Sequence, residues 1–284
     1  MFNYLTAFSR NIGWLTQDEQ QHLRHKRVAI AGMGGVGGIH LLTLARLGVE
    51  KFNIADLDTF ELANFNRQVG AGVATLNRPK VDVLADMARD INPECDLAAF
   101  SNGVNADNLA QFFQGVDLYV DGLDFFAFEA RERVFAYCAE HRIPAVTVAP
   151  LGMSAALLNF LPGGMSFEDY FRLAGCGELE KAVRFLVGLA PALLHRHYLA
   201  DKSRVDLKAH KGPSTVMACQ LCAGVAASEA LKILLQRGKV WAAPHAIQFD
   251  GYRNQLSHTW RPGGNRNPLN RIAIALASRQ LGIE

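Results

Sequence analysis

The residues best suited to chemistry begin with a glycine-rich turn. Its glycines are Gly32, Gly34, Gly35, Gly37 and Gly38. The turn follows the apolar run 28–31 and precedes a helical pattern at 36–47. A turn of this kind lets a phosphate approach the backbone, and the helix after it directs its free amides and the positive end of its dipole at that phosphate. The pattern G-x-G-x-x-G predicts a nucleotide-binding site.

A carboxylate stands at the end of the next expected strand. The run 52–55 predicts a second buried parallel strand, and Asp56 follows it directly. A carboxylate in this place can hold the ribose hydroxyls of a nucleotide. A nicotinamide-binding unit would have the same features, so the sequence up to Asp56 leaves the identity of the nucleotide open.

Polar and cationic residues continue beyond Asp56, at positions that a dinucleotide dehydrogenase does not need. They are Asp58, Asn64, Arg67, Lys80 and Asp124. A triphosphate is well matched by an arginine, which binds as a fork, together with a lysine, which acts as a point charge. Asp124 comes just after an expected strand, at the edge of the sheet where α/β proteins bind ligands. This set favours ATP.

Alternating strands and helices must position these residues. We expect parallel strands at 28–31, 52–55, 95–101, 116–121 and 144–149. We expect helices at 36–47, 80–90, 105–114 and 125–141. This alternation predicts an α/β fold, namely a Rossmann-like, doubly wound, mostly parallel sheet with helices on both faces.

The C-terminal half departs from this alternation. We expect added antiparallel strands at 154–161, 246–250 and 254–260, and a long Ala-rich helix at 212–236 capped by Gly238. Residues 165–211 form an insertion, in which His195 and His197 are expected at the surface. Residues 1–26 form an N-terminal helical extension, and we treat 1–284 as a single domain.

Composition narrows the class of protein. The chain has 284 residues and a formal net charge of +2, which predicts affinity for neither nucleic acid nor a membrane. No signal-peptide pattern and no run of 18 apolar residues are present. Five cysteines without the spacing of a small secreted domain fit a reducing compartment, so we expect a cytoplasmic protein.

With the glycine turn, Asp56, Asp58, Asn64, Arg67, Lys80 and Asp124 in this order, the chain resembles the ThiF/MoeB/ubiquitin-activating superfamily. The resemblance covers residues 8–160 well and residues 212–250 by pattern. It implies an ATP-dependent adenylyltransferase that activates a carboxylate as an acyl-adenylate and releases pyrophosphate. The expected partner is a small ubiquitin-like or sulfur-carrier (ThiS/MoaD-like) protein, whose C-terminus supplies the carboxylate.

The resemblance also implies roles for single residues. Asp56 holds the ribose with Asp58 near it or near the metal, Asn64, Arg67 and Lys80 contact the phosphates, and Asp124 coordinates Mg²⁺. The glycines that line the nucleotide are Gly32, Gly34, Gly35 and Gly37. Arg10 matches an arginine that crosses a homodimer interface to the phosphates of the partner subunit.

The cysteines mark where the chain departs from that family. Many members hold a structural zinc with two C-x-x-C pairs, whereas here Cys219-x-x-Cys222 is the single pair, so no structural zinc is expected. We interpret both as small core residues. Cys176, flanked by Gly175 and Gly177, is a candidate acyl acceptor and equally well an ordinary loop cysteine.

Three alternatives stay open. A related enzyme could adenylate a carboxylate borne by tRNA, or one on a short peptide. An NAD(P)-dependent oxidoreductase would account for residues 32–56 but would leave Arg67, Lys80 and Asp124 without a use. A non-catalytic relative could bind a partner without any reaction.

Overall fold

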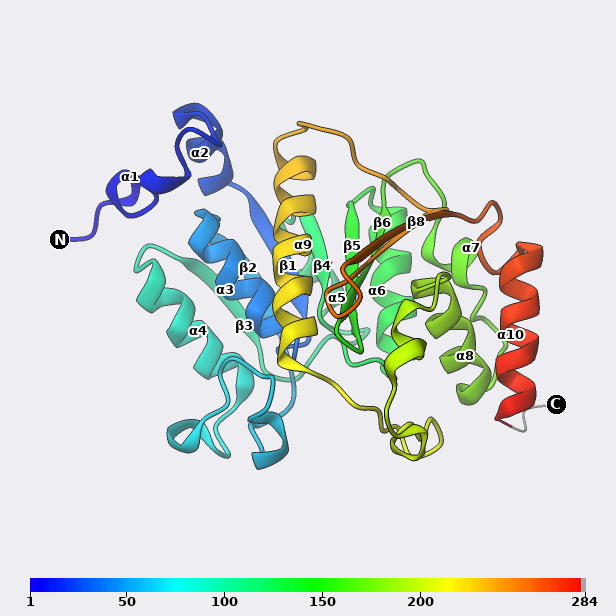
Figure 1. The fold of residues 1–284 in the computed structure, drawn as a ribbon. Coiled ribbons are helices and arrows are strands. Elements are labelled where there is room, and N and C mark those ends of the chain that lie inside the picture. Colours follow the sequence, from blue (N-terminus) through cyan, green and yellow to red (C-terminus); the bar gives the residue numbers. More distant parts are fainter. Residues whose placement is uncertain (282–284) are drawn as a thin grey trace.

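One mixed sheet organises the chain, as a computed structural model that describes residues 1–281 shows. Its strands are β1 (Arg27–Ala31), β2 (Lys51–Ala55), β3 (Asp96–Phe100), β4 (Leu118–Asp121), β5 (Ala145–Leu151), β6 (Ser154–Phe160), β7 (His245–Asp250) and β8 (Gln255–Trp260). Their spatial order is β3-β2-β1-β4-β5-β6-β7-β8. Strands β1 to β5 pair in parallel, and β6, β7 and β8 add antiparallel (Figure 1). The predicted doubly wound, mostly parallel sheet is confirmed.

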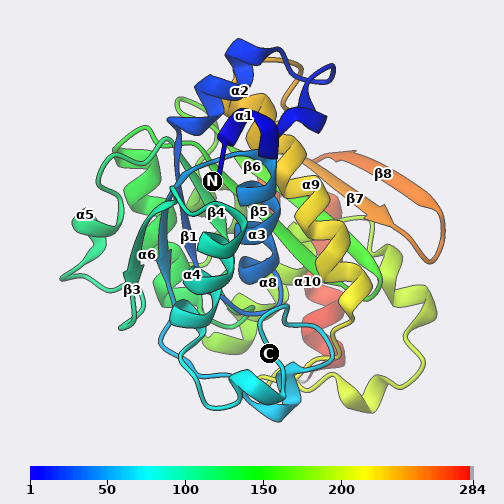
Figure 2. The ribbon, with the colours of Figure 1, turned by 90° about the vertical axis from the view of Figure 1, so that its left-hand side faces the viewer.

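Helices cover both faces of this sheet. They are α1 (Tyr4–Ala7), α2 (Gln17–Arg24), α3 (Gly37–Leu47), α4 (Lys80–Ile91), α5 (Leu109–Phe112), α6 (Phe128–Glu140), α7 (Phe167–Phe171), α8 (Glu178–Leu189), α9 (Val216–Leu234) and α10 (Pro268–Gln280). One core cluster unites the sheet with α3, α4 and α9, and a second unites the other face with α6, α7 and α8. Helices α3, α4 and α9 can be followed in Figure 2. The order β3-β2-β1-β4 reverses direction beside β1, which places a ligand crevice at the carboxyl ends of β1 and β4.

The helix expected at 105–114 is much shorter than predicted. Asn105 Oδ1 accepts hydrogen bonds from the amides of Asp107 and Asn108, and Asn108 Oδ1 accepts one from the amide of Asn105. These side-chain bonds hold the backbone in a turn that competes with a helix. Regular helix therefore begins only at Leu109.

Helix α9 is the long Ala-rich helix, and the prediction of its cap was wrong. The helix ends with Leu235 as its C-cap, Gln236 has a φ of 50°, and Gly238 lies beyond the helix. By length and composition α9 could cross a membrane, with a mean hydropathy of 1.4. Its residues Cys222, Ala226 and Ala230 instead belong to the core under the sheet.

Three glycines bring the functional end of the sheet together. Gly32 ends β1 with a φ of 86°, in the left-handed region that favours glycine. A Cβ on Gly37 would overlap the carbonyl oxygen of Gly32, and a Cβ on Gly122 would lie 2.5 Å from the same oxygen. The turn after β1, the start of α3 and the loop after β4 can therefore pack backbone against backbone.

We expect Gly122→Ala to destabilise the protein by about 3 kcal/mol, the upper end of the usual cost of overpacking. The added methyl group must displace the backbone of Gly32, Gly37 or Ala31. Gly224→Ala in α9 is the matched control, because nothing lies within 4 Å of its Cβ position. Urea unfolding of the two variants measures the difference, and equal midpoints would contradict this account of the glycine contacts.

Burial favours the neutral form of two histidines, one fully buried and one half-buried. His40 in α3 is fully buried, neither of its ring nitrogens has a hydrogen-bond partner among the described residues, and burial lowers its pKa to about 4. Burial likewise lowers the pKa of His195 to about 4, and its Nδ1 lies 3.3 Å from Gln248 Nε2. The expectation that both insertion histidines lie at the surface holds for His197, which is exposed, but not for His195, which is half-buried against Gln248 of β7.

The pKa of His40 makes stability depend on pH. The unfolded chain binds a proton near pH 6.5 and the folded chain near pH 4, so stability is lost as the pH falls through this window. From neutral to acid pH, we expect the free energy of unfolding of His40→Leu to fall by about 3 kcal/mol less than that of the wild type. Chemical unfolding of both proteins at pH 7.5 and pH 4.5 measures it. An identical pH dependence in the variant would refute the assignment.

Candidate functional site

The site lies at the carboxyl edge of the parallel strands. The turn after β1, the long loop between β2 and α4 and the loop between β4 and α6 all begin at this edge. In Figure 1 the loop after β2 and the segment that leads into α9 lie at the same end of the molecule. The fold therefore gathers most of the residues that the sequence singles out.

Asp56 ties the glycine turn to the following loop. Its Oδ2 accepts a hydrogen bond from the amide of Met33 at 2.5 Å, and its Oδ1 accepts one from the amide of Asp58 at 2.8 Å. Both amides lie beside the path expected for a nucleotide, and the carboxylate is half-buried. Its position fits the expected contact with a ribose, which remains a prediction.

Lys80 presents an ammonium group from a buried stem. The residue is 6% exposed and opens α4, and its Nζ lies 2.8 Å from Asp58 Oδ2. Its amide also donates to the carbonyl oxygen of Asp58 at 3.0 Å. Asp58 is itself mostly exposed, so the pair fixes the ammonium group where an incoming phosphate could take over from the carboxylate.

Arg67 lies over the glycine turn. The short 3-10 helix Leu62–Asn64 precedes it, and the carbonyl oxygen of Asn64 accepts from the amide of Arg67 at 3.1 Å. Arg67 Nη1 donates to the carbonyl oxygen of Ala63, and its Nε lies 3.7 Å from the position of a Cβ on Gly35. Asn64 Oδ1 is used within the loop, where it accepts from the amide of Glu61.

Asp124 is exposed on the loop after β4. Its Oδ1 accepts a hydrogen bond from the amide of Phe126 at 3.0 Å. Mg²⁺ prefers one or two carboxylates together with phosphate oxygens and water. An exposed aspartate two residues from the glycine contact fits that preference, with Asp58 as a second carboxylate across the same edge. The chemistry of these donors therefore suits Mg²⁺.

Cys219 and Cys222 lie in the core, as the sequence suggested. Cys219 Sγ lies 3.2 Å from the Cβ position of Gly35, directly beside the turn. Burial raises the pKa of both thiols. They support the turn by packing.

Arg10 lies far from the site of its own chain. The side-chain amide of Asn11 donates to the carbonyl oxygen of Leu47 at 3.1 Å, so this segment is attached to the last turn of α3. The glycine turn precedes the first turn of that helix, about 16 Å away at 1.5 Å per residue. Figure 1 shows α1 and α2 at the end of the sheet opposite the loop after β2.

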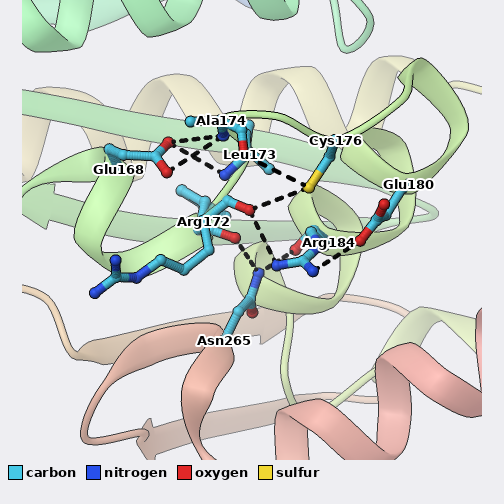
Figure 3. A network of polar contacts seen from close by, with 9 residues as sticks. Glu168, Arg172, Leu173, Ala174, Cys176, Glu180, Arg184 and Asn265 are labelled. Atoms are coloured by element: carbon cyan, nitrogen blue, oxygen red, sulfur yellow. Dashed lines mark hydrogen bonds and ion pairs between the residues drawn. The ribbon is translucent and has the colours of Figure 1, made fainter.

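Cys176 lies in a separate network of polar contacts within the insertion (Figure 3). Its thiol is half-buried and 3.6 Å from the carbonyl oxygen of Arg172, and Glu168 accepts hydrogen bonds from the amides of Leu173 and Ala174. Burial raises the pKa of Cys176, Arg184 lowers it and Glu180 raises it again. A raised pKa leaves little thiolate at neutral pH. Its role as acyl acceptor remains a prediction.

The sequence analysis missed Asp121 and Arg131. Asp121 ends β4 and Arg131 lies in α6, and their side chains form a buried ion pair at 2.9 Å. A signal was present, since Arg131 falls at helical spacing between Phe128 and Val134 on the apolar face of α6. A charged residue at such a position requires a partner.

Several curated relatives match part of the chain. The tRNA threonylcarbamoyladenosine dehydratase of Bacillus subtilis is 33% identical over 144 residues, which is 50% of this chain and 56% of the relative. The molybdopterin-synthase adenylyltransferase of Haemophilus influenzae is 27% identical over 221 residues, 70% of this chain and 90% of that protein. The alignments to the first relatives thus cover about half of their length.

Solved structures show the same fold. The Escherichia coli tRNA N6-threonylcarbamoyladenosine dehydratase TcdA superposes with a TM-score of 0.61 at 23% identity, covering 82% of this chain and 95% of that chain. The structure of PaaA gives a TM-score of 0.68 at 18% identity, covering 90% of this chain and 73% of that chain. Residues 8–271, which include the glycine turn, Lys80 and Asp124, match the ThiF family, and this chain belongs to it.

Proposed function

We propose that this protein is an ATP-dependent adenylyltransferase that activates the C-terminal carboxylate of a small ubiquitin-like or sulfur-carrier protein. The proposal is carried by three observations: Arg67 lies beside Gly35, Lys80 pairs with Asp58 after β2, and Asp124 closely follows Gly122, which packs on the glycine turn. Membership of the ThiF family supports it, and favours ATP over a nicotinamide dinucleotide. ATP as co-substrate also agrees with the expected cytoplasmic location.

The chemistry follows from charge and position. A substrate carboxylate attacks the α-phosphorus, a new C–O–P linkage forms, the bond to the β-phosphate breaks, and pyrophosphate leaves. No general base is needed, because a C-terminal carboxyl group with a pKa of about 3.5 is already ionised. Lys80, Arg67 and the amides of the turn stabilise the phosphate charge. Asp124, with Asp58, would hold Mg²⁺, which neutralises further charge on the leaving group.

A second candidate is the same reaction on a carboxylate borne by tRNA. The segment 196–211, which leads to α9, carries five exposed cationic residues: Arg196, Lys202, Arg204, Lys208 and Lys211. The segment reaches the site, because His210 stacks on Phe126 at 4.5 Å and Ser214 accepts a hydrogen bond from Asn66. Locally clustered charge matters more for RNA than the net charge of +2. A short peptide is a third substrate class; the solved relative MccB was crystallised with the peptide MccA.

We propose a homodimer in which Arg10 serves the site of the partner subunit. Arg10 is exposed and cannot reach the glycine turn of its own chain. Large apolar side chains are exposed on α9 and on β8, among them Met217, Leu256 and Trp260. A second copy packed on this face would cover them.

We expect Lys80→Met to lower isotope exchange between pyrophosphate and ATP by about 100-fold, the usual effect of removing one group that stabilises developing charge. Exchange is measured with candidate carrier proteins, peptides and tRNA in turn. Arg78→Met is the matched control, because Arg78 is half-exposed and pairs with Asp86 at 3.1 Å. Full exchange in Lys80→Met, or a wild-type protein that binds NAD and not ATP, would refute the proposal.

The dimer predicts complementation between two inactive variants. Arg10→Ala and Lys80→Met, mixed and allowed to exchange subunits, form one intact site in each mixed dimer. Half of the dimers are mixed and half of their sites are intact, so exchange should return to about one quarter of the wild-type rate. Arg10→Ala that is fully active alone, or a mixture no more active than its components, would contradict the role of Arg10.

A further inference from the structure

A single arginine side chain holds the loop that carries Asp124. Arg131 is 2% exposed. Its Nη2 donates to the carbonyl oxygens of Leu123 at 2.7 Å and Asp124 at 2.9 Å, and its Nη1 donates to that of Phe125 at 3.2 Å. Three consecutive carbonyl groups thus point at one guanidinium group.

The guanidinium group is itself fixed by Asp121. Arg131 Nε donates to Asp121 Oδ2 at 2.9 Å, and Thr147 Oγ1 donates to the same oxygen at 2.9 Å. Asp121 Oδ1 accepts from the hydroxyl of Tyr119 and from the amide of Leu123, both at 3.2 Å. The carboxylate therefore joins β4, β5 and the loop, and leaves Arg131 little freedom to move.

A residue of the insertion, Phe185, packs against Arg131. The ring of Phe185 in α8 lies under the guanidinium group, 4.6 Å from its central carbon. Phe125 and Phe128 pack on the same ring at 5.3 and 5.8 Å. An aromatic wall excludes water, so the hydrogen bonds from Arg131 to the loop have no ready replacement.

The loop is also fixed at its beginning. Gly122 packs against the backbone of Gly32 and Gly37, as described above. Asp124 lies between that contact and the carbonyl groups held by Arg131. Both anchors act on backbone atoms, so they set the position of the Asp124 carboxylate relative to the glycine turn without using the carboxylate.

We propose that Arg131 is a positioning residue for the divalent metal that accompanies ATP, acting through the backbone of the loop 122–126. The inference rests on the proposed function, since it requires a metal and nucleotide at this edge. If Arg131 only stabilised the fold, its ion pair with Asp121 would be sufficient. The hydrogen bonds to three carbonyl groups of the loop, one of them that of Asp124 itself, are what give Arg131 the further role.

The test measures metal binding directly and needs no carboxylate substrate. Mn²⁺ binding to the protein with a non-hydrolysable ATP analogue is followed by electron paramagnetic resonance. Arg131→Lys keeps the charge beside Asp121 but cannot form the fork. We expect it to weaken Mn²⁺ binding at least 10-fold, as changes to groups that orient metal ligands usually do. Binding of the analogue in the presence of EDTA should change less than about 3-fold, because the phosphate cations are untouched.

Arg133→Lys is the matched control, since Arg133 lies on the same helix and pairs at the surface with Glu129 at 2.8 Å. It should bind Mn²⁺ as the wild type does. If Arg131→Lys does not fold, Phe185→Leu removes the ring under the guanidinium group at a tolerable cost in packing. This variant should weaken Mn²⁺ binding about 3-fold with the same analogue affinity.

The outcomes separate the two proposals. Unchanged Mn²⁺ affinity in a folded Arg131→Lys protein, with only a lower melting temperature, would overturn the positioning role and leave the proposed function intact. A wild-type protein that binds neither the analogue nor Mn²⁺ would overturn the proposed function, and this inference with it.

Discussion

The structure depends on one steric constraint, the backbone contact among Gly32, Gly37 and Gly122. Because these positions have no side chains, the end of β1, the start of α3 and the loop after β4 can pack backbone against backbone. The Asp56 carboxylate then reaches the amide of Met33, and Asp124 comes within reach of the same crevice. The chemistry of the site is thus a consequence of missing Cβ atoms.

Two cations at or near the site have a carboxylate partner before any ligand arrives. Lys80 already has Asp58 as a partner, and the buried Arg131 has Asp121. The two ion pairs differ in their exposure to solvent. Lys80 is buried but its partner Asp58 is mostly exposed, so water screens the pair and a phosphate can replace the carboxylate. Arg131 and Asp121 are enclosed, where an unpaired charge would be very unfavourable, so that pair stays closed.

The sequence predicts the parallel core well, because buried strands and glycine turns have strong local patterns. It also predicts where Arg67 and Lys80 lie in the fold, because Arg67 follows β2 and Lys80 opens α4, while their roles remain predictions. It fails where distant segments decide. The position of His195 against β7 depends on such a segment, and the network of Arg131 joins β4, β5, α6 and α8. The prediction also fails at Asn105 and Asn108, whose local side-chain hydrogen bonds delay the start of α5. Nor does periodicity indicate that Asn11, next to Arg10, is attached to the far end of α3.

The position of the insertion has a consequence for how such a protein can diversify. The chain leaves the sheet after β6 and returns through α9, yet β6 pairs directly with β7. The strand pairing of the sheet is therefore complete without residues 165–211, and these can change in length and charge while the sheet is retained. A changed insertion would still have to supply the ring of Phe185 that packs under the guanidinium group of Arg131.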